Sequence, residues 1–345
     1  MRNGRNRYYQ GPPSDHFDGE RFFLPGHRVT NSTWGLLKWQ LGAERVRWPR
    51  RVANRPHDAL PNILDSSEIH VTFIGQATML IQAAGINILT DPFFSERASP
   101  FQWAGPKRVR PPGVPFDALP PIHAVLVSHN HYDHLDLPTI RRLHDRHSPL
   151  ILTPLGNGAI LRRTRRPLRI EEGDWGDRFP VGDGVAVSFA PAVHWSRRGP
   201  RDRNMALWAS FVIETPAGLI YFAGDTGYGS GAHFRAVPEQ FGPVRLALLP
   251  IGAYEPRWFM HRHHMNPDDA VKAHLDLGAE RSLGIHHSTL QLTNEGIGDP
   301  PAALAQALAE RGLEPHIFRA VEPGEGLRIV GPATRIRGAL ATAAE

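Results

Sequence analysis

The sequence contains no cysteine in its 345 residues. This absence excludes disulfide bonds, thiolate metal ligands and a cysteine nucleophile. No uninterrupted apolar run reaches the roughly 18–20 residues that a membrane-spanning helix needs. The first residues also lack the apolar segment of a secretory signal. We therefore expect a cytoplasmic protein without a signal peptide or transmembrane segment, for which peripheral contact with a membrane stays open.

Lysine is scarce as well. Only Lys38, Lys107 and Lys272 accompany the arginines that carry the basic charge, and the net charge is +5. Such a surface suits an anionic partner, for example a phosphate ester, a phospholipid surface or nucleic acid. It is equally expected of a solvated surface whose arginine content follows genome composition. The charge alone therefore does not identify a partner.

The chain divides by composition into an extension and one domain. Residues 1–66 are polar and rich in Arg, Gly and Pro, with scattered aromatic side chains and a single helix-like stretch at 34–41. Because so many aromatic residues would be poorly placed in free solution, we expect this extension to pack on the core. Contact between its basic and aromatic residues and lipid headgroups is the alternative. Residues 67–345 show no linker and no internal repeat, which indicates one domain.

Short apolar runs alternate with helical patterns from residue 69 onward, which predicts an α/β fold. The runs 69–73, 78–82 and 86–90 are separated by short turns and predict an antiparallel meander. Further strands are expected over 124–127, 151–153, 185–190, 207–213, 219–222, 246–250, 282–285 and 326–330. Helices are expected over 138–147, 267–277 and 300–311, the second with Asn266 as its cap.

A dense group of metal-capable side chains follows the apolar run 124–127. The segment Ser128-His129-Asn130-His131-Tyr132-Asp133-His134 places three imidazoles and a carboxylate within six residues. In extended backbone, His129 and His131 point the same way, and imidazole with carboxylate ligands suits zinc. A solvated His-rich loop is the alternative for this segment taken by itself.

Other metal-capable residues also come directly after predicted strands, and this shared placement favours a site at one edge of the sheets. Asp91, fixed by Pro92, is expected to orient a ligand and not to bind metal itself. The candidate metal ligands are His129, His131, Asp133, His134, His194, Asp225 and His286. They divide into two sets of three with Asp225 as a bridge, which leaves an open position on each ion, as in catalytic zinc sites.

The motif His129-x-His131-x-Asp133-His134, with the three later ligands, resembles that of the metallo-β-lactamase superfamily. The resemblance implies a four-layer αββα sandwich with the metals at one edge of the two sheets. Longer stretches look like the N-acylphosphatidylethanolamine-hydrolysing phospholipase D group, among them 89–92, 97–100, 105–108, 128–136, 194–198, 224–228 and 250–260. Two positions depart from that group, because Gln76 and His287 stand where histidine and tryptophan are common.

The resemblance implies two Zn²⁺ ions per chain, or other divalent transition metals, with a metal-bridging hydroxide as nucleophile. Iron is disfavoured, because iron-dependent relatives tend to carry glutamate where His131 stands. The implied activity is a phospholipase D-type phosphodiesterase that acts on N-acylphosphatidylethanolamine or a related phospholipid. Asp133, Asp225 and His264 are then the catalytic candidates, although His264 could equally cap the helix that begins near Pro267. The candidate substrate contacts are Gln76, Arg197, Arg198, Tyr254 and His287.

Two other functions stay open. One is a hydrolase with the same metals and a different substrate, such as a lactone or a cyclic or nucleotide phosphodiester. The other is a non-enzymatic module that binds anions or nucleic acid through its arginines, which complete metal sets and the lack of a known nucleic-acid-binding motif disfavour. An oligomer such as a dimer is compatible with the sequence.

Overall fold

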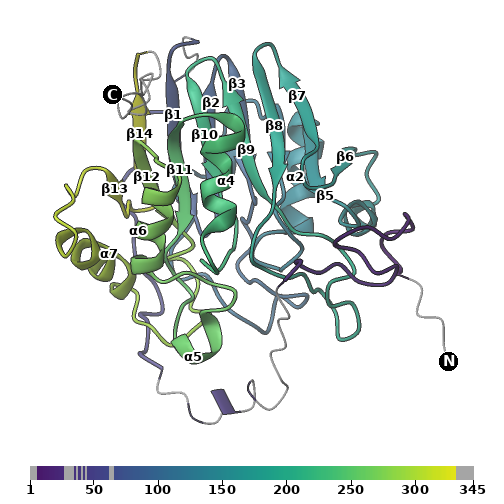
Figure 1. Ribbon diagram of the computed structural model, residues 1–345, viewed down its shortest axis with the longest axis horizontal. Coiled ribbons are helices and arrows are strands. Elements are labelled where there is room, and N and C mark those ends of the chain that lie inside the picture. The colour runs from purple at the N-terminus through teal and green to yellow at the C-terminus, as the bar shows by residue number, and fades with distance from the viewer. Residues whose placement is uncertain are drawn as a thin grey trace, which may run out of the picture.

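We analysed a computed structural model of the chain. The structure describes residues 6–26, 45–61 and 66–331, together with positions 35, 38, 39 and 42. The helix-like stretch expected at 34–41 lies largely outside the described residues. Two sheets of seven strands each lie face to face, with helices on both outer faces (Figure 1).

The first sheet has the strand order β14-β1-β2-β3-β4-β5-β6. Its bounds are β1 (Ile69–Gly75), β2 (Thr78–Ala83), β3 (Ile86–Thr90), β4 (Ala124–Leu126), β5 (Leu150–Pro154), β6 (Arg169–Gly173) and β14 (Gly326–Ile329). The pairs β1–β2 and β2–β3 are antiparallel, so the predicted meander is confirmed. From β3 to β6 the pairing is parallel, so β3 and β4 end at the same edge of the sheet.

The second sheet has the order β13-β12-β11-β10-β9-β8-β7. Its bounds are β7 (Arg178–Gly182), β8 (Val185–Ala190), β9 (Ser210–Thr215), β10 (Gly218–Phe222), β11 (Val244–Pro250), β12 (Arg281–Ile285) and β13 (Phe318–Arg319). Strand β9 runs antiparallel to both β8 and β10, while β10, β11 and β12 are parallel. Strands β8, β10 and β12 therefore run in one direction, and their carboxyl ends meet at one edge.

Helices cover the two outer faces, which makes the molecule a four-layer α/β sandwich, as predicted. The helical elements are η1 (Phe116–Ala118), α2 (Leu137–His147), α3 (Gly158–Leu161), η2 (Arg162–Thr164), α4 (Ala232–Phe241), α5 (Arg257–Met260), α6 (Pro267–Asp276) and α7 (Asp299–Ala309). In Figure 1, α4 and α6 lie in front of the second sheet and α2 lies behind. Asn266 caps α6 as predicted, because its side chain accepts a hydrogen bond from the Asp269 amide.

The central strands are buried on both faces, and their side chains alternate between two cores. In β4, Ala124 and Leu126 face the core between the sheets, while Val125 faces the core under α2. In β11, Leu248 faces the same central core and Leu249 the one under α4, α6 and α7. This packing fixes the register of each strand, since a slip by one residue would exchange the two faces.

Two parts of the fold add to what the sequence predicts. The arginines of the segment 161–169 are exposed, and the segment forms the end of α3, η2 and the start of β6. Residues 6–26 pack on the segment that leads into β9, where Phe17 and Phe22, each 1% exposed, share a core with Leu207 and Trp208. Among the described residues, no helix has the length and apolar character needed to cross a bilayer.

Candidate metal centre

The loop that follows β4 carries four of the seven candidate ligands, and the other three follow β8, β10 and β12. The directions of these strands bring all four ends to one edge of the sandwich. The close approach of the two sheets there depends on Gly224, which has φ +59°. A Cβ at Gly224 would lie 2.7 Å from Cβ of Ser128, so only glycine lets Asp225 reach the β4 loop without displacing it.

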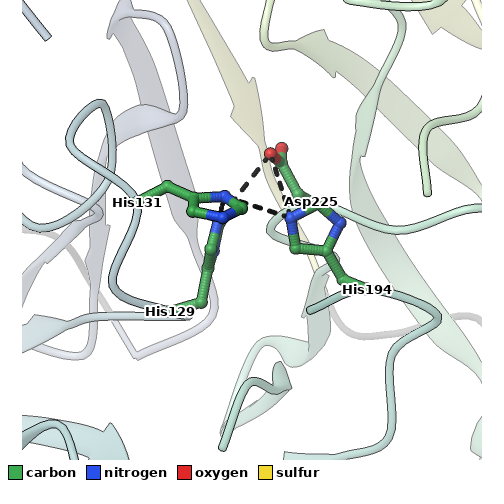
Figure 2. A group of neighbouring side chains, drawn as sticks. All are labelled: His129, His131, His194 and Asp225. Atoms are coloured by element: carbon green, nitrogen blue, oxygen red, sulfur yellow. Dashed lines mark hydrogen bonds and ion pairs between the residues drawn. The ribbon is translucent and has the colours of Figure 1, made fainter. Parts of the chain in front are cut away.

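Figure 2 shows the first group of ligand atoms, from His129, His131, His194 and Asp225. Nδ1 of His131 lies 2.8 Å from Nε2 of His129 and 3.3 Å from Nε2 of His194. Oδ2 of Asp225 lies 3.9 Å from Nε2 of His129 and 3.8 Å from Nε2 of His194. Three imidazoles and one carboxylate therefore point at a single place between the sheets.

The second group shares Asp225 with the first. Nε2 of His134 lies 3.3 Å from Oδ2 of Asp133 and 3.2 Å from Oδ2 of Asp225. Nε2 of His286 lies 3.2 Å from Oδ2 of Asp133 and 3.3 Å from Oδ1 of Asp225. Oδ2 of Asp225 thus faces both groups, and Oδ1 faces His286 of the second group.

The arrangement fits divalent metal ions. A tetrahedral zinc ion with bonds of about 2.0–2.1 Å holds its ligand atoms about 3.3–3.4 Å apart, and all four contacts of the second group are 3.2–3.3 Å. Within the described part of the chain, Nε2 of His134 and Oδ1 of Asp225 are buried without a hydrogen-bond partner. Such atoms are costly unless something binds them, and a cation between them would do so.

The protonation states of the first group suit metal binding directly. Burial lowers the pKa of His131 to about 4 and lowers the pKa of His129 and His194 well below the ordinary value. These three imidazoles are therefore neutral at pH 7 and keep a lone pair for a metal.

In the second group, Asp225 and Asp133 raise the pKa of His134 and His286 against the effect of burial, so a metal bound there would displace protons from these imidazoles. Burial alone would raise the pKa of Asp133 and Asp225, but the neighbouring His134 and His286 hold both well below the ordinary value, so both carboxyls are ionised.

Asp91 orients one histidine of each group, which agrees with its predicted role. Its Oδ2 accepts hydrogen bonds from Nδ1 of His134 at 2.7 Å and from Oγ of Ser128 at 2.6 Å. Oγ of Ser128 lies 3.0 Å from Nδ1 of His129, which can donate to it. In the first group, Nδ1 of His194 lies 3.0 Å from the carbonyl oxygen of His263. Each contact fixes the tautomer that leaves Nε2 free for a metal.

The comparisons with known proteins agree with this geometry. A family model described as a β-lactamase superfamily domain matches residues 86–287. An uncharacterised protein of Mycobacterium tuberculosis is 40% identical over 309 residues, which span 86% of this chain and 78% of that protein. The chain belongs to the metallo-β-lactamase superfamily.

Two further relatives place it within the superfamily. N-acyl-phosphatidylethanolamine-hydrolyzing phospholipase D 1 of Caenorhabditis elegans is 36% identical over 269 residues, which are 75% of each chain. The structure of Igni18, a metallo hydrolase from Ignicoccus hospitalis, matches the fold with a TM-score of 0.56 at 19% identity and covers 76% of this chain and 98% of that chain. This protein is therefore a metal-dependent hydrolase of the metallo-β-lactamase superfamily, with homologues in the phospholipase D group.

Gln76 and His264 lie at the metal centre. Nε2 of Gln76 lies 2.9 Å from both Oδ2 of Asp133 and Nε2 of His286, so its amide contacts the second group directly. His264 is buried, and one of its ring nitrogens lies within 4.8 Å of ligand atoms of Asp225 and His286. Burial lowers the pKa of His264 to about 4, so its imidazole is neutral at pH 7. The contact with Asp225 and His286 supports a place in the site more than a role in capping α6, whose cap is Asn266.

The other candidate substrate contacts lie further from the ligand atoms. The His287 ring stacks on Phe73 at 5.1 Å, and Arg197 is exposed, with Nε donating to the Gly199 carbonyl. Arg198 turns its guanidinium onto backbone carbonyls of the β4 loop, at Asn130 and Leu135. Substrate binding by these residues stays a prediction, but Arg198 already has a structural partner.

Tyr254 lies in the loop after β11, which a buried glutamate holds in place. The buried carboxylate of Glu295 accepts hydrogen bonds from the amides of Ala253, Tyr254 and Glu255 at 2.6, 3.3 and 3.1 Å. Glu295 thereby fixes the loop after β11 beside the metal centre. No sequence signal indicates this role, because Glu295 is 40 residues distant from Glu255 along the chain.

Proposed function

We propose that this protein is a phosphodiesterase of the phospholipase D type that uses two divalent ions, Zn²⁺ in the first place, on N-acylphosphatidylethanolamine or a related phospholipid. The observation that carries the proposal is the pair of ligand groups that share Asp225. The C. elegans relative, 36% identical over 75% of its length, supports the substrate class. The positive net charge of +5 is compatible with an anionic substrate.

In this proposal His129, His131, His194 and Asp225 would hold one ion, and Asp133, His134 and His286, with Asp225 shared, would hold the other. Bound divalent ions lower the pKa of water and neutralise negative charge on a phosphoryl group. Water attacks phosphorus, the bond to the ethanolamine oxygen breaks, and the products are phosphatidic acid and an N-acylethanolamine. The ionised carboxylates of Asp133 and Asp225 can accept the proton that the water loses.

In this proposal His264 returns a proton to the leaving oxygen, a role supported by its place beside Asp225 and His286. Because its imidazole is neutral before the reaction, with a pKa of about 4, it can deliver only a proton that the attacking water has released. The Gln76 amide keeps Asp133 oriented through its hydrogen bond at 2.9 Å. His264 thus transfers a proton and Gln76 orients Asp133. The nucleophile in this proposal is water.

The test is turnover by the full chain loaded with Zn²⁺. The substrates are N-acylphosphatidylethanolamine and phosphatidylcholine in mixed micelles, a bis-aryl phosphodiester and an aliphatic lactone, and mass spectrometry identifies the products. The proposal predicts phosphatidic acid and N-acylethanolamine from the first substrate, and no product from Asp225→Asn. Turnover of the lactone or of the soluble diester alone would overturn the lipid assignment in favour of another superfamily hydrolase. Nucleic acid binding without any turnover would overturn the enzymatic one.

A further inference from the structure

The β4 loop, residues 128–135, holds four candidate ligands but has only three residues of strand before it. Its own backbone hydrogen bonds are few: the amides of His134 and Leu135 donate to the His131 carbonyl at 3.2 and 2.9 Å. A loop of this kind needs external contacts to hold its ligands within a few tenths of an ångström of their working positions. Asp91 supplies such a contact from the sheet side, through His134 and Ser128.

Arg198 supplies a second set of contacts. One guanidinium nitrogen, Nη1, donates to the carbonyl of Asn130 at 3.0 Å and to that of Leu135 at 2.7 Å. These two carbonyls bracket His131, Asp133 and His134. The guanidinium also lies 4.0 Å from the centre of the Tyr132 ring, and the Tyr132 hydroxyl donates to the Arg198 carbonyl at 3.0 Å. Arg198 and the β4 loop therefore hold each other at four points.

Arg198 is itself held by Asp202. The Asp202 carboxylate accepts hydrogen bonds from the amides of Arg198 and Gly199 at 3.0 and 2.7 Å. Its other oxygen accepts a hydrogen bond from the Tyr8 hydroxyl at 2.7 Å. Burial alone would raise the pKa of Asp202, but these donors outweigh it and the pKa is lowered. The carboxylate is thus ionised and bound to the N-terminal segment, residues 6–26.

The N-terminal segment is anchored along this same stretch. The amide of Phe22 donates to the Asn204 carbonyl at 2.7 Å, and Nδ2 of Asn204 donates to the Phe22 carbonyl at 3.1 Å. Nδ2 of Asn6 donates to the Met205 carbonyl at 2.9 Å, and Asn6 is 1% exposed. In Figure 1 this segment, drawn in purple, lies beside the loop that follows β8. The loop that begins after His194 is therefore fixed at several points by chain that lies far away in sequence.

We propose that Arg198 is a positioning residue for the metal centre, and that the N-terminal segment acts on the metal ligands through Tyr8, Asp202 and Arg198. The path has three contacts: Tyr8 to Asp202, Asp202 to the Arg198 amide, and the Arg198 guanidinium to the β4 loop. It assigns Arg198 to the protein backbone and not to a substrate phosphate. It also implies that residues 6–26 contribute to the metal affinity of the site. It does not depend on which ester the enzyme cleaves, because metal affinity is measured without substrate.

The experiment compares full-length variants by competition for Zn²⁺ with a chromophoric chelator and by the visible spectrum of the Co²⁺-substituted protein. Arg198→Met keeps the length of the side chain and removes its donors, so we expect affinity to fall about 10- to 100-fold, the usual effect of losing a group that orients ligands. Arg198→Lys keeps a single donor and should recover part of this loss. Tyr8→Phe removes one distant hydroxyl and should weaken binding about 3-fold, a fraction of the 10-fold lower bound.

Two matched controls separate this effect from general loss of stability. Arg142→Lys alters a cation of α2 that lies 3.8 Å from the centre of the Phe116 ring, and Tyr9→Phe alters the residue next to Tyr8, whose ring packs on Phe17 at 5.1 Å. Both should leave Zn²⁺ affinity and the Co²⁺ spectrum unchanged. Unchanged affinity in both Arg198→Met and Tyr8→Phe would overturn the proposal. So would a raised KM in Arg198→Met with wild-type metal affinity, since that result assigns Arg198 to the substrate.

Discussion

Asp91→Asn is the substitution whose effect the structure defines best. Asp91 is fully buried, and its carboxylate accepts three hydrogen bonds: from the Ser128 amide at 2.7 Å, from the Ser128 hydroxyl at 2.6 Å and from Nδ1 of His134 at 2.7 Å. Its φ of +34° lies near the left-handed region, which asparagine adopts more readily than most residues. The substitution therefore changes hydrogen bonding and charge with little backbone strain.

An asparagine amide can keep the bond from the Ser128 amide but places an NH₂ group where Oδ2 accepted from Ser128 and His134. Two hydrogen bonds to a charged acceptor are lost, each worth about 1.5–3 kcal/mol. His134 must then rotate or shift its proton to Nε2, the atom that faces Asp133 and Asp225. The expected loss in metal affinity is about 10- to 100-fold, which is about 1.4–2.7 kcal/mol.

The assay is chelator competition for Zn²⁺, read together with thermal unfolding of the metal-free and metal-loaded forms. Asp136→Asn is the matched control. The Asp136 carboxylate is also buried and accepts from the Ser95 amide at 3.0 Å and from the Ser95 hydroxyl at 2.9 Å. Its hydrogen bonds within the described part of the chain go to residues that are not candidate metal ligands. It should lower stability and leave metal affinity unchanged. If Asp91→Asn behaved as Asp136→Asn does, the proposed orientation of His134 and His129 by Asp91 would be refuted.

Three further outcomes are expected. Asp225→Asn replaces the carboxylate shared by both groups with a neutral amide. Elemental analysis should then find fewer than two bound ions per chain, and turnover should fall at least about 100-fold. Glu295→Gln places an NH₂ group opposite backbone N–H donors at 253–255, so at least one hydrogen bond is lost. A denaturant titration should show the free energy of unfolding lowered by about 1–3 kcal/mol. Burial lowers the pKa of His274 to about 4, so the unfolded chain binds more protons between pH 6.5 and 4. The stability that this group contributes is complete above pH 6.5, falls by up to about 3 kcal/mol as pH drops to 4, and should lose this slope in His274→Gln.

The sequence predicted the fold wherever hydrophobic pattern and strand direction determine it. The runs 69–73, 78–82 and 86–90 became β1 to β3 because their alternating side chains have two cores to fill. Strands β6 and β7 were missed, since both are only partly buried and carry charged or proline residues where a buried strand has apolar ones. Their strand form comes from pairing with β5 and β8, a tertiary contact that local pattern does not encode.

The candidate site likewise contains residues that the local sequence pattern predicts and residues that it does not. The convergence of the seven candidate ligands could be predicted because each follows a strand, and parallel strand ends share an edge. The residues that hold the ligands were found only where they also end a strand, as Asp91 does. Tyr8, Asp202 and Glu295 carry no such signal, because ordinary polar residues in loops acquire their roles from partners up to 194 residues distant in the chain. Arg198 is an example. Its sequence context, a basic residue near a histidine, predicts a phosphate contact as readily as the backbone contacts that the structure shows.

The distribution of ligands over two sheets has a consequence for stability. Four ligands follow β4 of the first sheet, and His194, Asp225 and His286 follow strands of the second. Cations held between them would join the sheets at the edge where the loops are longest, while the apolar core joins them elsewhere. Metal binding then stabilises the fold by an amount set by ligand excess, about 4 kcal/mol at a thousand times Kd. The N-terminal segment contacts the β4 loop through Tyr8, Asp202 and Arg198. We therefore expect a change in this segment, in the β4 loop or in the sheet interface to reach the metal centre.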